Sequence, residues 1–189
     1  KETHELMHIF QQYFPGFKNA RIKSVASQLG VRETRRIVGD YMLTVSDLRE
    51  EKSFEDNIGF SMYGWDLPDP KRPSIQPFAE DEKSGFKSKV EKGLSTPLPY
   101  QIMVPKTIEN LICPGRAVSV EGQVLGPVRV MAPCMAMGEA AGMACKQVVG
   151  ENKSFGTIDI PKLREKLRAV GAIVDKQQLP PIYPRVDQT

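Results

Sequence analysis

The stretch that most constrains the fold is GPVRVMAPCMAMGEAAGMAC, residues 126–145, because it consists almost entirely of small and apolar side chains. We predict that it forms a helix with Pro133 as its first residue and Gly150 as its C-cap. Gly138 and Gly142 would keep one side of this helix thin enough to approach another backbone or a flat ring closely. The alternative is tight packing of the helix on a sheet with no ligand between them.

The residues that precede this helix predict a binding site at its N-terminus, where the helix dipole is positive. We expect a strand at 100–106 (YQIMVPK) and a short buried strand at 110–115 (NLICPG), closed by Gly115-Arg116 and a glycine-punctuated loop. A helix that follows such a loop directs free backbone N–H groups toward whatever lies beyond the end of the strand. The order of elements therefore predicts a place for an anion or another electron-rich group.

The remaining elements are expected from periodicity and from stop signals. A helix over 2–13 should end at Pro15-Gly16, and a last helix over 160–171 should bury Leu163, Leu167 and Val170. The other expected elements are a strand at 21–31, an extended segment at 35–44 that Gly39 interrupts, a helix with Ser46 as its N-cap that runs to about Ile58, and an extended tail at 176–189. Residues 67–99, rich in Pro, Lys and Gly, predict a long loop, which is either an active-site cover or a surface excursion.

Three arginines, Arg32, Arg35 and Arg36, fall within five residues beside apolar neighbours. Arginine suits the planar, bidentate recognition of carboxylates and phosphates, so the cluster is a candidate anion anchor. Ion pairs with acidic residues of the same region are the alternative. These acidic residues are Glu33, Asp40 and Glu50.

Composition excludes several classes of protein. The 189 residues are 40% hydrophobic and 26% charged, as in globular proteins, and a net charge of +3 with scattered Lys and Arg does not indicate nucleic-acid binding. Three cysteines without a CxxC pair argue against a disulfide framework and favour a reducing, cytoplasmic compartment. Only two histidines are present, so no metal site is expected, and no apolar run reaches the length of a membrane span.

Cys134 lies in the first turn of the predicted helix, where a thiolate would be stabilised. A redox-active cysteine is one interpretation. A small, buried structural residue is the interpretation that we favour, because Cys145 lies about three turns away along the same helix.

Three segments, in this order and spacing, resemble the C-terminal half of FAD-dependent oxidoreductases. They are GVRETRRIVGDYMLT (30–44), VPKTIENLICPGRAVS (104–119) and GPVRVMAPCMAMGEAAGMA (126–144). The wider superfamily includes glutathione reductase and the flavoproteins of fumarate reductase and succinate dehydrogenase, and the likeness runs from about residue 20 to about residue 175.

The resemblance implies an α/β fold, α+β in part, that belongs to a two-domain flavoprotein. Residues 1–100 would be a portion of the substrate domain, with its sheet and the long loop. Residues 101–150 would be the returning strand and helix of the FAD-binding domain, and residues 151–189 a C-terminal helix and extended tail.

The resemblance also implies roles for particular residues. Gly115 and Arg116 would contact the ribityl or pyrophosphate part of FAD, and the backbone of Arg129, Val130 and Met131 would face the pyrimidine side of the flavin. Arg32, Arg35 and Arg36 would lie near the ring or the substrate as catalytic candidates. The expected reaction is hydride transfer between the flavin and a small organic, anionic substrate. The loop VEGQVLGP lacks the His and Ser that family members often carry there, which leaves the roles of those two residues unassigned.

The GxGxxG turn that holds the ADP pyrophosphate in this superfamily is absent from the sequence. Together with the start at Lys1, this absence leads us to expect the C-terminal part of a longer polypeptide, which needs its N-terminal half and alone binds FAD weakly or not at all. A signal peptide on that half and a homo-oligomer are left open. The alternatives are a non-catalytic binding or assembly module that has lost FAD, and an anion-binding α/β domain unrelated to flavin.

Overall fold

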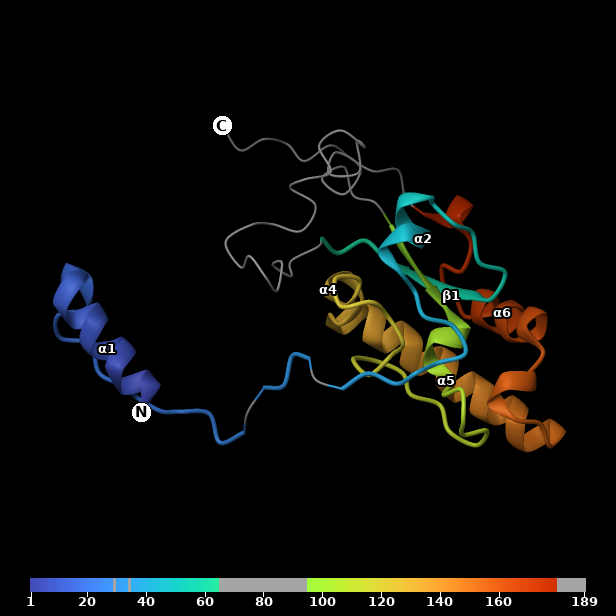
Figure 1. Cartoon of the computed structure of the whole chain (residues 1–189), viewed down its shortest axis with the longest axis horizontal. Coiled ribbons are helices and arrows are strands. Elements are labelled where there is room, and N and C mark those ends of the chain that lie inside the picture. The colour runs from blue at the N-terminus through green and yellow to red at the C-terminus, as the bar shows by residue number, and fades with distance from the viewer. Residues whose placement is uncertain (29, 34, 65–94, 180–189) are drawn as a thin grey trace. The chain divides into compact units, whose positions relative to one another are not determined.

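The computed structural model describes residues 1–28, 30–33, 35–64 and 95–179. The chain forms two compact units, Lys1–Val31 and Arg32–Thr189, which are considered separately below (Figure 1). Among the described residues, no helix is both long enough and apolar enough to cross a membrane.

The first unit is a helix followed by a turn. Helix α1, Glu2–Tyr13, confirms the predicted helix, and the 3-10 turn η1, Pro15–Phe17, follows it. The rings of Phe10, Phe14 and Phe17 pack on one another, with centroids 5.2–6.3 Å apart. The strand predicted at 21–31 is wrong, because the described residues there pair with no neighbouring strand.

The second unit contains a two-stranded antiparallel sheet. Strand β1, Asn57–Ser61, pairs with β2, Thr96–Pro99, and Asn57 lies opposite Pro99. The end of the predicted loop 67–99 is therefore a strand, whereas residues 65–94 lie outside the described residues. The strand predicted at 100–106 is wrong in its position: the ladder comes just before it, and Tyr100–Met103 forms the 3-10 turn η3.

Helix α2 spans only Val45–Arg49, much less than the helix predicted from Ser46 to about Ile58. Its N-cap is Thr44, whose hydroxyl accepts from the Asp47 N–H, while the Asp47 carboxylate accepts from the Thr44 N–H. This capping box fixes the start of the helix two residues earlier than a cap at Ser46 would. Asn57 and Ile58 belong instead to β1.

Residues 35–44 are extended, as predicted, but they form isolated bridges rather than a strand. Gly39 bridges Pro105, and Leu43 bridges Val120. The buried strand predicted at 110–115 is wrong: the segment has no regular structure, and none of its residues is fully buried. Its Cys113 N–H donates to the Met103 carbonyl at 2.8 Å.

The helix predicted in residues 126–145 is present as two elements, α4 (Leu125–Val128) and α5 (Met131–Glu151). Helix α5 starts two residues before Pro133, since the first-turn residues of a helix need no N–H partner and tolerate proline there. Its C-cap is Asn152 in the left-handed conformation, not Gly150.

The core lies between α5, β1 and helix α6, Ile160–Ala169, which pack against one another (Figure 1). Met137, Ala140 and Ala144 of α5 are fully buried, and so is Leu163 of α6. Leu167 is also buried, as predicted. Val170, by contrast, is 59% exposed, because it is the C-cap of α6 and lies beyond its last turn.

Two short turns complete the unit, η4 (Phe155–Thr157) and η5 (Lys176–Gln178). The extended tail predicted from residue 176 thus begins with a 3-10 turn, and its residues 180–189 lie outside the described residues. The unit is a mixture of helices and a small sheet, in agreement with the α/β expectation at this coarse level.

Candidate functional site

An open hollow of about 530 Å³ lies at the N-terminal end of α5. Gly115, Arg116 and Met131, three of the five residues predicted to contact a cofactor, lie in its wall. The rest of the wall is mostly apolar and consists of Pro114, Ala117, Cys134 and Met135. The structure thus places the Gly-Arg turn and the start of the small-residue helix at one site.

The turn at Gly115 has a conformation that glycine suits. Its φ is +90°, which L side chains rarely adopt, and a Cβ there would lie 3.9 Å from the Cys134 Sγ. The next residue, Arg116, donates from Nε to the Arg129 carbonyl over 3.4 Å. This bond ties the turn to the residues just before α5.

Arg129 and Val130, the other two predicted cofactor residues, lie directly ahead of α5. Val130 is its N-cap and makes no side-chain capping hydrogen bond, so no capping side chain covers the start of the helix. Arg129 is only 5% exposed, and its Nη1 lies 3.0 Å from a carboxylate oxygen of Glu33. Met131, in contrast, is 75% exposed in the wall of the hollow.

The backbone of the segment that carries the three arginines forms a hydrogen bond with a residue in the wall of the hollow. The Ile37 N–H donates to the Ala117 carbonyl at 2.8 Å. Arg36 extends to Gly122, where a Cβ would lie 3.8 Å from one of its guanidinium nitrogens. Arg32, Arg35 and Arg36 are all exposed, and none of them lines the hollow.

Two of the three acidic residues suggested as partners of these arginines, Glu33 and Glu50, make contacts with other residues. Glu33 pairs with Arg129, and the Glu50 carboxylate accepts from the Ser46 hydroxyl at 3.1 Å. The pairing of Glu33 with Arg129 joins residues 96 positions apart, and no local pattern in the sequence indicates it.

The Cys134 thiol lies half-buried in the wall of the hollow. Burial raises its pKa, and the nearby Arg116 cation offsets only part of this effect. Its Sγ lies 3.5 Å from the Arg129 carbonyl and 3.8 Å from the Val128 carbonyl, both of which accept from the thiol. These contacts favour the structural interpretation of Cys134 over a reactive thiolate.

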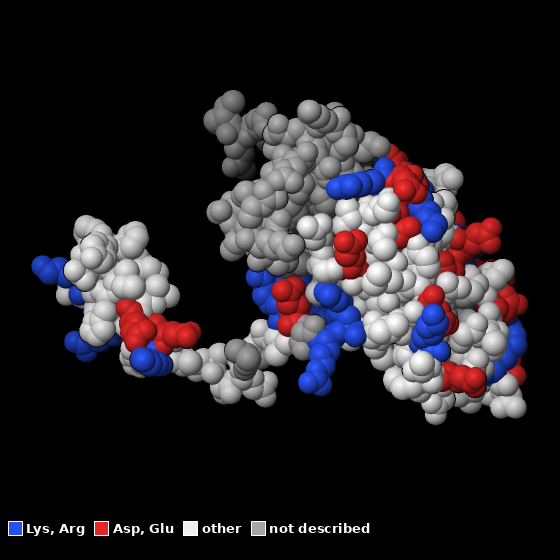
Figure 2. Space-filling model, viewed as in Figure 1, with Lys and Arg blue, Asp and Glu red and all other residues white. Residues whose placement is uncertain are grey.

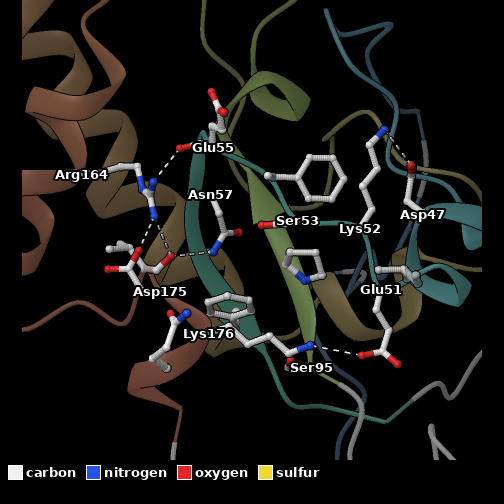
Figure 3. Close-up of a pocket in the computed structure, with 16 residues that line it drawn as sticks. Asp47, Glu51, Lys52, Ser53, Glu55, Asn57, Ser95, Arg164, Asp175 and Lys176 are labelled. Atoms are coloured by element: carbon white, nitrogen blue, oxygen red, sulfur yellow. Dashed lines mark hydrogen bonds and ion pairs between the residues drawn. The ribbon is translucent and has the colours of Figure 1, made fainter.

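A second cavity, of about 370 Å³, lies between α2, the sheet, α6 and η5 (Figure 3). Three ion pairs hold its wall: Lys52 with Asp47, Arg164 with Asp175, and Lys176 with Glu51. The last pair joins residues 125 positions apart, so sequence patterns give no signal for this cavity. Positive and negative side chains therefore lie together in this wall.

Charged side chains elsewhere also mix in sign. Figure 2 shows Lys and Arg beside Asp and Glu on the visible face of the described residues. No group of three or more His, Cys, Asp or Glu with the arrangement of a metal site occurs in the described part of the chain.

Comparison with known proteins places the chain in a family. The family model for FAD dependent oxidoreductases matches residues 1–167. Searches of curated proteins and of solved structures gave no significant match. Since the family model covers well over half of the sequence, the chain belongs to the FAD dependent oxidoreductase family.

Proposed function

We propose that the hollow at the start of α5 receives the flavin of an FAD-dependent oxidoreductase that acts on a small organic anion. The observation that carries this proposal is the meeting of Gly115, Arg116 and Met131 in one wall, since they come from two separate motifs. In the same proposal, residues 1–100 belong to the substrate domain, residues 101–150 to the FAD-binding domain, and residues 151–189 form a C-terminal helix and tail.

The residues of the hollow fit a flavin in three respects. The wall is mostly apolar, which suits a flat ring. The N-terminus of α5 has no side-chain cap, so its N–H groups and positive dipole are available to a group that gathers negative charge. Arg116 adds a cation at the edge of the wall, where a ribityl hydroxyl or a phosphate would find a donor.

FAD, when bound, supplies the two-electron chemistry of hydride transfer. The chain's own residues would bind and orient. Gly115 and Arg116 would hold the ribityl or pyrophosphate part, and the backbone of Arg129, Val130 and Met131 would face the pyrimidine edge. Arg32, Arg35 and Arg36, all exposed on the neighbouring segment, would attract and anchor an anionic substrate.

Riboflavin, which lacks the phosphates, tests the hollow directly. In a titration followed by NMR, we expect the backbone signals of Gly115, Ala117 and Met131 to shift, and those of Asn57 and Arg164 in the second cavity to stay in place. The variant Gly115→Ala should weaken these shifts, because the residue at this position must adopt a φ of +90°.

A matched control is Gly171→Ala, since Gly171 has a φ of +89° after α6 and does not line the hollow. This variant should lose similar stability and keep riboflavin binding. Shifts confined to the second cavity would refute the proposed flavin site.

The affinity for whole FAD is a separate question. Without a GxGxxG turn in the sequence, the purified chain should bind FAD weakly or not at all, and its absorption spectrum should lack a flavin band. Stoichiometric yellow flavin in the purified chain would contradict this expectation.

A further inference from the structure

Arg129 and Glu33 form an ion pair of unequal partners. The guanidinium of Arg129 is 5% exposed, whereas the carboxylate side chain of Glu33 is 48% exposed, and they meet at 3.0 Å. A buried cation needs a compensating anion, because the cost of removing it from water is large. Glu33 supplies that anion from the solvent side.

The two partners are also held unequally. Arg129 caps the end of α4, its N–H donates to the Leu125 carbonyl, and its own carbonyl accepts from Arg116 and from the Cys134 thiol. Glu33 lies in a segment whose described residues, 31–33 and 35–36, form neither helix nor strand. The backbone of Arg129 is thus fixed by hydrogen bonds at its N–H and at its carbonyl, and the more exposed Glu33 carboxylate is the partner with more room to move away.

The pair lies beside the start of α5. Arg129 is one residue before the N-cap of this helix, and its carbonyl is the acceptor that ties Arg116 into the wall of the hollow. A guanidinium recognises carboxylates and phosphates with the same planar fork of donors. An oxyanion that reaches Arg129 can thus take the place that the Glu33 carboxylate holds on the guanidinium.

We propose that the side chain of Arg129 is an anion-binding group of the site and that Glu33 is its internal ligand, displaced when an oxyanion of the substrate or cofactor arrives. The proposal rests on the proposed function for the source of the anion, which is either a substrate carboxylate or a phosphate of FAD. It adds a role for the Arg129 side chain, beside the role of its backbone, and it makes Glu33 a competitor rather than a simple structural partner.

Two simple oxyanions, malonate and pyrophosphate, test the proposal without flavin. Their affinities for the whole chain are measured by NMR or calorimetric titration, in the wild type and in Glu33→Gln. Removing the competing carboxylate should raise the affinity for at least one probe by about fivefold or more. A gain for malonate alone assigns the site to a substrate carboxylate, and a gain for pyrophosphate alone assigns it to a cofactor phosphate.

The control is Glu109→Gln, which removes the same charge from another exposed glutamate, in the wall of a different hollow. It should leave both affinities within about twofold of the wild type, as expected for a remote surface charge. An equal gain in the control would reduce the effect to net charge and overturn the proposal.

The double variant Glu33→Gln/Arg129→Gln should lose the gain, and its persistence would overturn the proposal. If this variant does not fold, the Arg129 side-chain N–H signal in Glu33→Gln decides instead. It should move on addition of the anion, and a stationary signal would overturn the proposal. Because neither probe contains a flavin ring, failure here is distinguishable from failure of riboflavin to enter the hollow.

Discussion

The Nε–H of Arg116 donates to the backbone carbonyl of Arg129 across 3.4 Å, and this bond joins the Gly-Arg turn to the entrance of α5. The same carbonyl accepts from the Cys134 thiol at 3.5 Å. One acceptor therefore holds together three of the motif residues around the hollow.

This arrangement predicts an order of reactivity among the cysteines. Burial raises the pKa of Cys134, and Arg116 offsets only part of the rise, so less of the reactive thiolate is present near neutral pH. Burial also raises the pKa of Cys113, whereas Cys145 is exposed on α5. We expect Cys145 to react with iodoacetamide first and Cys134 about tenfold more slowly, as peptide mass spectrometry over time would show.

The variant Arg116→Gln sharpens this test. It removes the cation that lowers the Cys134 pKa, so the reaction of Cys134 should slow by a further few-fold, while that of Cys145 should not change. Labelling of Cys134 ahead of Cys145 in the wild type would contradict the structure of the hollow.

A second prediction concerns Asp47, which joins the cap of α2 to its surroundings. Burial alone would raise its pKa, but hydrogen bonds from Tyr41, Thr44 and Lys52 together outweigh burial and hold the pKa below its ordinary value. The stabilisation is therefore complete above the unfolded-state pKa and is lost as the pH falls through the lower folded-state value.

We expect Asp47→Asn to lower the free energy of unfolding by about 1–2 kcal/mol near neutral pH, through loss of the charged cap. The difference from the wild type should shrink as the pH falls through the lowered folded-state pKa of Asp47, because the wild-type carboxyl then becomes protonated too. Urea unfolding at several pH values measures both effects. Glu50→Gln, an exposed neighbour, is the control and should change stability by less than about 0.5 kcal/mol. A difference that grows in acid would rule out this account.

The elements that could be predicted from sequence are those with local signals. Helix α1 ends where Pro15-Gly16 predicts, and α6 begins at Ile160, after the N-cap Asp159, whose carboxylate accepts from the Lys162 N–H at 3.0 Å. The positions of the strands were harder to predict from the sequence. An apolar run such as 100–106 fits a strand or a buried turn equally well, and the actual pairing of β1 with β2 joins segments far apart in sequence.

The candidate site could be predicted only in part. Its motifs, with Gly115, Arg116 and Met131, came from resemblance to a family, and the structure brings these three into one wall. Whether they contact FAD stays a prediction. The Glu33–Arg129 pair and the ion pairs around the second cavity depend on tertiary contacts between distant segments, which no local pattern encodes.

Two glycines, Gly138 and Gly39, differ in the space around them. Gly138 lies within α5, and a Cβ there would meet no atom within 4 Å among the described residues. Gly39 is its opposite, since a Cβ there would lie 2.8 Å from the Ser119 Cβ and 3.1 Å from two backbone carbonyl oxygens.

Gly138→Ala should therefore stabilise the chain by about 0.5–1 kcal/mol, because alanine loses less backbone entropy in a helix and nothing here obstructs its methyl group. Gly39→Ala should instead cost about 2 kcal/mol through overpacking. Urea unfolding of the two variants measures both effects. If Gly138→Ala destabilised the chain, that face of α5 would have to be packed in solution, and a fall in oligomeric size of this variant would identify a second copy as the cause.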